Sequence, residues 1–402
     1  MIINNQGKIK PRAATLVGYH GYQNLGDDIF LRLICRWLGS SLNIKKCYLS
    51  TKGDMTERLI SGVQVIPFKC PVTNIISRLQ WIFIFSKAMQ SDALIFSAGS
   101  IFTIQPFFLI YLVLRFLRFF RGKDLRIMAI GVSIGPFYSI RDQYWCLKGL
   151  SLMDYVLLRD YQSKLLVDCA KESINAQLSF DLALSWNEKQ STIKLAKRSA
   201  MIGLAITERA LGICKTNHTD NCIAVLKALE EMLANFNEVK VRILCVCSDQ
   251  HDGDRLISHH FQEILTSRWG DRIEAVYYEA ENIDKMLNSI AECSFLISAR
   301  MHVGIMGILA SVPVYQISYA EKIRNFFIHS ELSTQYLHDH NKISQQSIYE
   351  FISRAMNGHL ANFTNTQQFI LEEKGKRVSF DLDTLAKEIA IVHPNAKTPS
   401  LR

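Results

Sequence analysis

The sequence predicts an α/β protein built from two Rossmann-like domains that face a cleft. Short apolar runs alternate with segments of helical periodicity along most of the chain, and such alternation is typical of parallel βαβ units. The alternation starts again after a polar, charged stretch at residues 186–198. At 402 residues the chain is also longer than one hydrophobic core usually supports, which favours two domains.

In the first half, the apolar runs are short and separated by segments of helix length. A helix is expected over residues 27–38, with Asp27 or Asp28 near its N-terminal cap. Strands are expected at residues 13–17, 93–96, 126–130 and 155–158. We therefore place the first domain at residues 1–188.

The second half repeats this pattern. Helices are expected at residues 221–236, 283–291 and 303–310, and strands at residues 201–206, 241–246, 295–298 and 312–318. We place the second domain at residues 189–345. Residues 346–402 read as a helical extension that becomes a polar tail after Pro394.

Composition limits the classes of partner. With 49% hydrophobic and 21% charged residues, the chain is globular rather than disordered. Its net charge of +9 is spread along the sequence without a long basic run, so we expect no nucleic-acid partner. Small acidic substrates or an anionic membrane surface fit the charge better.

The cysteines indicate the compartment. The ten cysteines have irregular spacing, which is typical of a reduced, cytoplasmic protein rather than a disulfide framework. No cluster with metal-ligand spacing is apparent, so we expect no metal and no cofactor. Residues 1–6 lack the charged-then-apolar order of a secretory signal.

The most lipid-like segment is Ile101 to Phe120. Pro106, Arg115 and Arg118 interrupt it, so its apolar core is too short to span a bilayer. Two interpretations stay open for it. It is either a helix buried in the domain core or a contact with the membrane surface, where aromatic side chains beside arginines are common.

A block from Ser298 to His302 is the sharpest candidate site. A short apolar run ends at Ser298, Arg300 and His302 follow two residues apart, and a helical pattern begins at once. The N-terminus of a helix attracts anions through its exposed N–H groups and its dipole. We therefore predict that Arg300 binds an anion and that His302 delivers a proton.

Glycine-rich junctions form the second group of candidates. The first predicted strand leads into a loop and a helix start at residues 18–28, which carry Gly18, Gly21 and Gly26. Two later strands end at residues 97–100 and 131–136. Ligands of parallel sheets bind at the carboxyl ends of strands, although tight turns alone also explain these glycines.

Other polar residues follow predicted strands. Arg159 could fork onto a carboxylate or phosphate, or pair with Asp160 or another acid. Lys322 follows the strand that ends at Ser318, and either reaches the site or lies in a solvated helix start.

Taken in this order, the blocks resemble the polysaccharide pyruvyl transferase family. The resemblance runs from about Gly18 to Phe327. It is carried by the Gly-x-x-Gly-x-x-Asn-x-Gly-Asp block at residues 18–27 and the Ser-x-Arg-x-His block at residues 298–302. Arg159-Asp160, Asp181 and the Tyr-x-x-Lys block at Tyr319 and Lys322 also agree.

The resemblance implies a GT-B-like fold and a transferase. Such an enzyme moves the enolpyruvyl unit of phosphoenolpyruvate onto two hydroxyls of a sugar, in a glycan that is often lipid-linked. It implies catalytic roles for His302 and Arg300. It further implies substrate-binding roles for Arg159, Gly18, Tyr19, Asn24, Gly26, Asp27, Gly99, Ser100, Tyr319 and Lys322.

Two other functions are compatible with the same residues. A GT-B-type glycosyltransferase would use Arg300 and Lys322 to bind the diphosphate of a nucleotide sugar. A non-catalytic adaptor would dock on membranes through residues 101–120. The expected location is the cytoplasm, with a possible peripheral contact at the inner face of the membrane.

Overall fold

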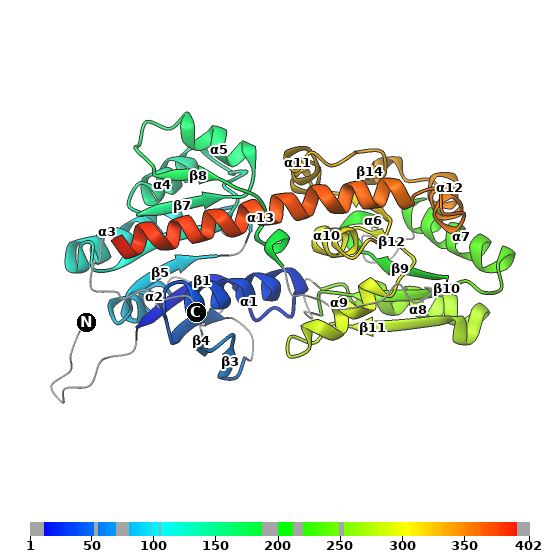
Figure 1. Ribbon diagram of the computed structural model, residues 1–402, viewed down its shortest axis with the longest axis horizontal. Helices are drawn as coiled ribbons and strands as arrows, with labels where there is room; N and C mark the ends of the chain where they lie inside the picture. Colours follow the sequence, from blue (N-terminus) through cyan, green and yellow to red (C-terminus); the bar gives the residue numbers. More distant parts are fainter. Residues whose placement is uncertain are drawn as a thin grey trace. The chain divides into compact units, whose positions relative to one another are not determined.

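A computed structural model describes residues 12–51, 55–69, 80–97, 99–103, 106–186, 200–211, 220–248 and 253–391. By its internal contacts the chain divides into two compact units. The first comprises Met1–Gly21, Ile29–Ser185 and Lys376–Arg402, and the second comprises Tyr22–Asp28 and Trp186–Gly375. Each unit contains a parallel sheet with helices packed on it (Figure 1).

The first unit is built on an eight-stranded sheet with the order β3-β4-β2-β1-β5-β6-β7-β8. The edge strand β3 pairs antiparallel with β4, and the other pairs are parallel. From β1 the chain steps outward to one side and then returns to β5, so the strand order reverses there. The strands are β1 (Ala13–His20), β2 (Lys46–Thr51), β3 (Arg58–Ile60), β4 (Val63–Lys69), β5 (Ala93–Phe96), β6 (Arg126–Val132), β7 (Tyr155–Leu158) and β8 (Ala176–Leu178).

Helices of the first unit bury their apolar stripes on this sheet. Four of them share one hydrophobic core with β5, β6 and β7, whose residues are buried along their whole length, as expected for strands covered on both faces. These four are α2 (Gln80–Met89), α3 (Phe107–Arg121), α4 (Ile140–Leu150) and α5 (Tyr161–Asp168). The remaining helical elements are α1 (Leu25–Ser40) and η2 (Leu182–Ser185).

The second unit contains a six-stranded sheet with the order β11-β10-β9-β12-β13-β14, parallel throughout. Counted from its first strand, this is the 3-2-1-4-5-6 order of the Rossmann fold, which reverses between β9 and β12. The strands are β9 (Met201–Ala205), β10 (Lys240–Cys245), β11 (Ile273–Tyr277), β12 (Phe295–Ser298), β13 (Val314–Ser318) and β14 (Leu337–Asp339).

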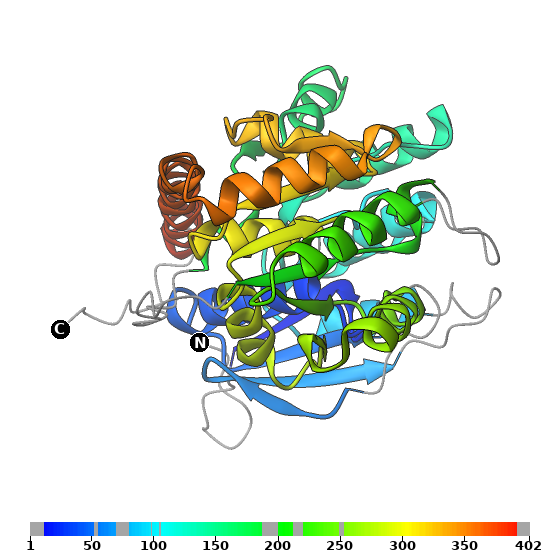
Figure 2. The same ribbon diagram turned by 90° about the vertical axis from the view of Figure 1, so that its right-hand side faces the viewer.

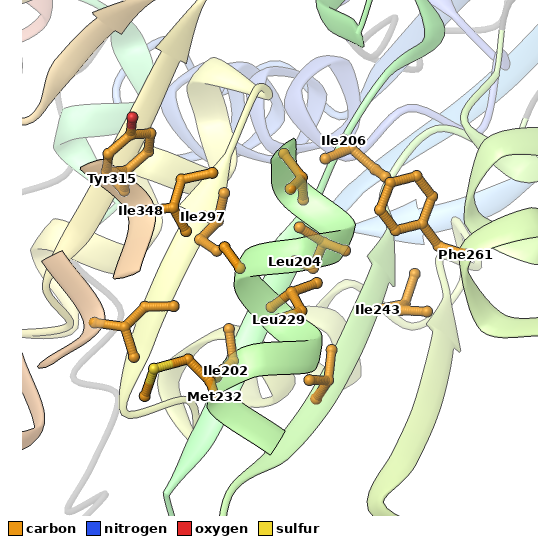
Figure 3. Packing of buried hydrophobic residues seen from close by; sticks show 14 of the residues in the cluster. Ile202, Leu204, Ile206, Leu229, Met232, Ile243, Phe261, Ile297, Tyr315 and Ile348 are labelled. Carbon is orange, nitrogen blue, oxygen red and sulfur yellow. The ribbon is translucent and has the colours of Figure 1, made fainter. Parts of the chain in front are cut away.

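A hydrophobic core on one face of this sheet joins strands β9, β10, β12 and β13 to helices α7, α8 and α12. Figure 3 shows Ile202, Leu204 and Ile297 packed against Leu229 and neighbouring side chains. Helices α7 and α12 lie side by side (Figure 2). The helical elements are α6 (Glu208–Leu211), α7 (Asp220–Asn235), α8 (Arg255–Trp269), η3 (Gly270–Arg272), α9 (Ile283–Ala291), α10 (Met301–Leu309), α11 (Glu321–His329), η4 (His340–Lys342) and α12 (Gln345–Met356).

The last helix, α13 (Ala361–Ile391), contributes residues to both units. Its earlier part bonds to the second unit, where Gln368 donates to the carbonyl of Leu309 at 3.2 Å. Its later part bonds to the first unit. There Asp381, which is fully buried, accepts hydrogen bonds from Gln177 at 2.8 Å and Ser179 at 2.6 Å.

The structure confirms the predicted fold class of two Rossmann-like domains. The strands 93–96, 155–158 and 295–298 and the helix 283–291 have the predicted bounds. Strands β2, β3, β4, β8, β11 and β14 were not anticipated by the pattern. The polar stretch at residues 187–198 and the tail after Pro394 lie outside the described residues.

The lipid-like segment forms α3, which is buried on one side only. Its inner face (Phe107, Ile110, Val113, Leu114 and Leu117) belongs to the core. Several aromatic side chains on its other face are exposed. Among the helices that the structure describes, none has the length and apolar character that crossing a membrane requires.

Candidate functional site

Arg300 lies at the carboxyl end of β12, where the strand order of the second sheet reverses. This is the edge at which open parallel sheets bind ligands. The Ser298 hydroxyl fixes the turn, because it accepts from the Arg300 N–H at 3.1 Å and donates to the Arg300 carbonyl at 2.8 Å. The next residue begins α10, so Arg300 lies at the N-terminus of that helix.

The guanidinium of Arg300 forks onto Asp254. Its Nε donates to Asp254 Oδ2 at 2.8 Å, and Nη2 donates to Oδ1. Asp254 is buried, whereas the Arg300 side chain keeps 20% of its surface exposed. Burial opposes the cationic form, but the facing carboxylate outweighs it and raises the pKa of Arg300 above its ordinary value. Arg300 is therefore a fixed cation, and its Nη1 lies outside the two hydrogen bonds to Asp254.

His302 is the second residue of α10 and is partly buried. Its ring lies against Gly26, in the first turn of α1. A Cβ at position 26 would lie 2.0 Å from Nδ1 and 2.6 Å from Cε1 of His302, far inside van der Waals contact. Glycine at position 26 therefore lets the backbone of α1 reach the imidazole.

The segment that carries Gly26 is fastened to the carboxyl end of β10. Leu25 N donates to the carbonyl of Val246 at 3.0 Å, and Ser248 N donates to the carbonyl of Gln23 at 3.0 Å. The buried Asp28 accepts from the Tyr278 hydroxyl at 2.8 Å. By its contacts this segment, Tyr22–Asp28, belongs to the second unit, although the glycine block begins in the first.

Asn24 and Asp27 have local structural roles in this segment. Asn24 Oδ1 accepts from Gly26 N at 3.3 Å, which satisfies an N–H of the first helical turn. Its amide nitrogen donates to Asp27 Oδ2 at 2.8 Å. Asp27 also places a negative charge at the positive end of α1. The asparagine and aspartate of the motif therefore hold the turn that presents Gly26 to His302.

Arg159 belongs to a separate constellation in the first unit. It directly follows β7 and is 7% exposed. Its Nη1 donates to Asp181 Oδ2 at 2.8 Å and its Nε donates to Ser133 Oγ at 2.7 Å. Of the two roles predicted for Arg159, the structure shows the ion pair with an acid of the chain. The partner is Asp181 rather than Asp160. Asp160 instead caps α5 by accepting from Ser163 N at 2.8 Å.

Gly99 lies against the guanidinium of Arg159. A Cβ at this position would be 2.1 Å from Nη1 and 2.3 Å from Cζ of Arg159. Gly18, within β1, is equally confined, because its Cβ would lie 1.9 Å from the carbonyl oxygen of Ser97. Tyr19 packs on the core of the first unit, and the Ser100 carbonyl accepts from the Thr103 hydroxyl at 2.9 Å.

The structure thus arranges the predicted residues in two sets. In the second unit, Tyr319 follows β13 and lies near enough to Arg300 to raise the pKa of its guanidinium further. Lys322 is exposed in the first turn of α11. One set holds Asn24, Gly26, Asp27, Arg300, His302, Tyr319 and Lys322, and the other holds Gly18, Tyr19, Gly99, Ser100 and Arg159.

Sequence reasoning missed Asp254, which is the partner of Arg300. A signal for it exists, since Asp249, Asp252 and Asp254 follow the predicted strand 241–246 at its carboxyl end. Ser133 lay in a recognised junction but was given no role. Among the described residues, no group of three or more histidines, cysteines or acids is placed to hold a metal ion.

Comparison with known families gives a match over most of the chain. The model of a family described as polysaccharide pyruvyl transferase matches residues 24–321. This range includes the Ser298–His302 block and starts inside the glycine block. Comparison with curated protein sequences gives no significant match.

Solved structures support the fold. A putative UDP-N-acetylglucosamine 2-epimerase from Listeria monocytogenes is similar with a TM-score of 0.61 at 10% identity, over 97% of this chain and 99% of that one. A trehalose 6-phosphate synthase from Burkholderia multivorans has a TM-score of 0.57 at 10% identity, over 96% and 100%. A sucrose-phosphate synthase from Thermosynechococcus elongatus has a TM-score of 0.57 at 10% identity, over 96% and 98%. These likenesses place the chain with GT-B glycosyltransferases and epimerases by fold.

Proposed function

The chain belongs to the polysaccharide pyruvyl transferase family, and we propose that it moves the enolpyruvyl unit of phosphoenolpyruvate onto two hydroxyls of one sugar in a glycan. The product is a cyclic pyruvate ketal, and inorganic phosphate is released. The observation that carries the proposal is the placement of Arg300 and His302 at the carboxyl end of β12 and the start of α10. A fixed cation, a helix N-terminus and an imidazole come together there.

Arg300 is suited to bind the carboxylate or phosphate of phosphoenolpyruvate. Asp254 orients its guanidinium through Nε and Nη2, and Nη1 lies outside those two bonds. The N–H groups at the start of α10 add a second attraction for an anion. An anion held at this point lies at the helix that also carries His302.

His302 is the proposed general acid. It would give a proton to the methylene carbon of phosphoenolpyruvate, which becomes a methyl group, and positive charge then develops at the neighbouring carbon. One sugar hydroxyl adds to that carbon, and its proton replaces the one that His302 gave up. The second hydroxyl then displaces the phosphate, which leaves with the remaining proton. General acid catalysis of this kind accelerates reactions roughly 10²–10⁴-fold.

The roles of the candidate residues in the first unit stay predictions, including that of Arg159 in holding phosphoenolpyruvate together with Arg300. Arg159 already pairs with the buried Asp181, so an anion-binding role for it requires a separate test. Gly18, Tyr19, Gly99 and Ser100 are proposed to shape the acceptor site through their backbone.

We propose a lipid-linked glycan as the acceptor and the cytoplasm as the place of reaction. None of the eight cysteines among the described residues forms a disulfide, which supports a reducing compartment. We propose that the reaction needs no metal and no cofactor.

The test is phosphate release from phosphoenolpyruvate across a panel of free hexoses and lipid-linked oligosaccharides. We expect release that depends on an acceptor, together with an acceptor product heavier by one pyruvate ketal. The same panel with nucleotide sugars, followed by nucleotide release, tests the glycosyltransferase alternative. Nucleotide release without phosphate release from phosphoenolpyruvate would overturn the proposal.

A further inference from the structure

An unusual number of large apolar side chains are exposed on helices α2, α3 and α4. On α3 these are Phe108, Phe116, Phe119 and Phe120, and Phe119 is 81% exposed. Ile82 and Phe83 of α2 are exposed beside them, as are Tyr138, Ile140 and Tyr144 at and before α4. We call this set of nine residues the aromatic face. Contiguous exposed apolar surface of this kind marks an interaction site.

Ring contacts link the three helices that carry the aromatic face. Helix α3 packs against α2 on one side and α4 on the other. Phe120 makes an edge contact with Phe85 of α2 at a centroid distance of 6.4 Å, and with Phe119 at 5.2 Å. Phe108 contacts Trp145 of α4 at 4.7 Å. Rings held against one another in this way form an ordered surface.

The inner faces of these helices already have their partner. Phe107, Ile110, Leu114 and Leu117 of α3 are buried in the core of the first unit. Burying the exposed phenylalanines in the core instead would require α3 to turn, which would break these contacts. The outer face of α3 is therefore open to a second partner.

The charges near the aromatic face indicate which partner fits. From Phe107 to Lys123 the sequence has four basic residues and no acid. Arg115 and Lys123 are exposed, as is Arg141 at the start of α4. Arg118 has a structural role, because it bonds to Asp154 at 2.7 Å and to the carbonyl of Leu152 at 2.8 Å. Exposed cations beside aromatic rings match the headgroups and acyl boundary of an anionic bilayer.

We propose that the aromatic face docks the protein on an anionic membrane surface. The phenylalanines of α3 enter the boundary between headgroups and acyl chains, and Arg115, Lys123 and Arg141 contact anionic headgroups. Binding is peripheral and reversible, since no described helix is suited to cross the bilayer. This inference goes beyond the proposed reaction, and it can be tested with vesicles alone.

The experiment measures co-sedimentation of the full chain with vesicles of phosphatidylcholine, with and without 30% phosphatidylglycerol by lipid composition. We expect binding to the anionic vesicles that weakens at high salt. The double variant Phe116→Ser/Phe119→Ser should bind at least about tenfold more weakly, because each phenylalanine supplies apolar burial. Arg115→Gln should weaken anionic-vesicle binding by about fivefold, and Lys123→Gln similarly.

The matched control is the double variant Ile328→Ser/Phe369→Ser. It removes two side chains of similar exposure, 59% and 62%, outside the aromatic face. It should bind vesicles like the parent chain. Equal binding by the parent chain and Phe116→Ser/Phe119→Ser would overturn the proposal, as would no binding by the parent chain.

A second measurement detects insertion of α3 directly and does not require a variant that has lost binding. In the Phe119→Trp variant, lipids brominated on the acyl chain should quench the tryptophan emission more than they do in the parent chain. Absence of that extra quenching would contradict insertion of α3. If light scattering shows instead that Phe116→Ser/Phe119→Ser turns a dimer into a monomer while vesicle binding is unchanged, the aromatic face joins two copies of the chain and the proposal fails.

Discussion

Gly26 and His302 are so close that a Cβ at position 26 would force the imidazole ring to shift. A Cβ there would lie 2.0 Å from the imidazole Nδ1. The end of the glycine block, at residues 24–27, and the Ser-x-Arg-x-His block are far apart in the sequence but form one local structure within the second unit. This contact ties the position of the His302 ring to the turn at the start of α1.

Replacement of Gly26 by alanine should displace the His302 ring. We expect a loss of at least tenfold in turnover, and a loss of about 1–3 kcal/mol in unfolding free energy from overpacking. Steady-state assays and urea unfolding measure the two effects. Gly149→Ala is the control, because its Cβ would meet only Leu114 Cδ1, at 3.9 Å. That helical substitution should be neutral or stabilising; equal turnover in both variants would contradict the inference.

His302→Ala should reduce turnover with phosphoenolpyruvate at least a hundredfold, because the general acid is lost. The side chain is partly buried, so we expect only a modest change in the melting temperature. Circular dichroism establishes that the variant is folded. A folded His302→Ala variant with parental turnover would refute the proton-transfer role.

Changes at Arg300 and Asp254 test phosphoenolpyruvate binding and fold stability separately. Arg300→Lys should weaken phosphoenolpyruvate binding at least tenfold, because an ammonium group cannot reproduce the fork. Asp254→Asn should destabilise the fold by about 3 kcal/mol, since it leaves a largely buried cation without its charge partner. Isothermal titration with phosphoenolpyruvate and urea unfolding test the two effects. Unchanged affinity in Arg300→Lys would argue against the anion clamp.

Arg159 and Asp181 form the corresponding pair in the first unit. Asp181→Asn should cost about 3 kcal/mol of unfolding free energy, because both partners are buried. Ser133→Ala removes one hydrogen bond to the same guanidinium and should cost about 1 kcal/mol. Urea unfolding of both variants measures the difference. Equal stability of Asp181→Asn and the parent chain would show that this ion pair is dispensable.

His20 should make stability depend on pH. Burial, together with the nearby Arg58 cation, lowers the pKa of His20 to about 4. The unfolded state then binds more protons than the folded state between about pH 6.5 and pH 4, so stability falls as the pH falls through that window. The lowered pKa of His20 should reduce the unfolding free energy by about 2 kcal/mol between pH 7 and pH 5. His20→Gln should lack that contribution in urea unfolding; identical pH profiles would contradict it.

The sequence alone predicted much of the local structure. Alternation of apolar runs and helical segments predicted two parallel-sheet domains, and the bounds of strand 295–298 and helix 283–291 agree with the structure. These features depend on residues close together in the chain, so near-neighbour periodicity reveals them. Strands β2 and β4 escaped notice because polar residues break the apolar run in β2 and Pro67 interrupts the β pattern in β4.

The candidate site was predicted in part. Arg300 and His302 were identified from a strand-to-helix junction, which is a local pattern. The positioning roles of Asn24 and Asp27 became visible only in the structure, where their side chains bond to each other. For α3 the pattern left burial and membrane contact both open, and the structure describes one buried face and one exposed face.

By itself, the sequence determined the alternation of strands and helices in two domains, the family blocks and the places of Arg300 and His302 at a strand-to-helix junction. Tertiary structure alone decided the pairings: Arg300 with Asp254, Arg159 with Asp181, and Asp28 with Tyr278 across 250 residues. Such contacts leave no periodic trace in the sequence. They form because folding buries a charge or a hydroxyl, and each buried polar group then requires a partner from wherever the chain supplies one.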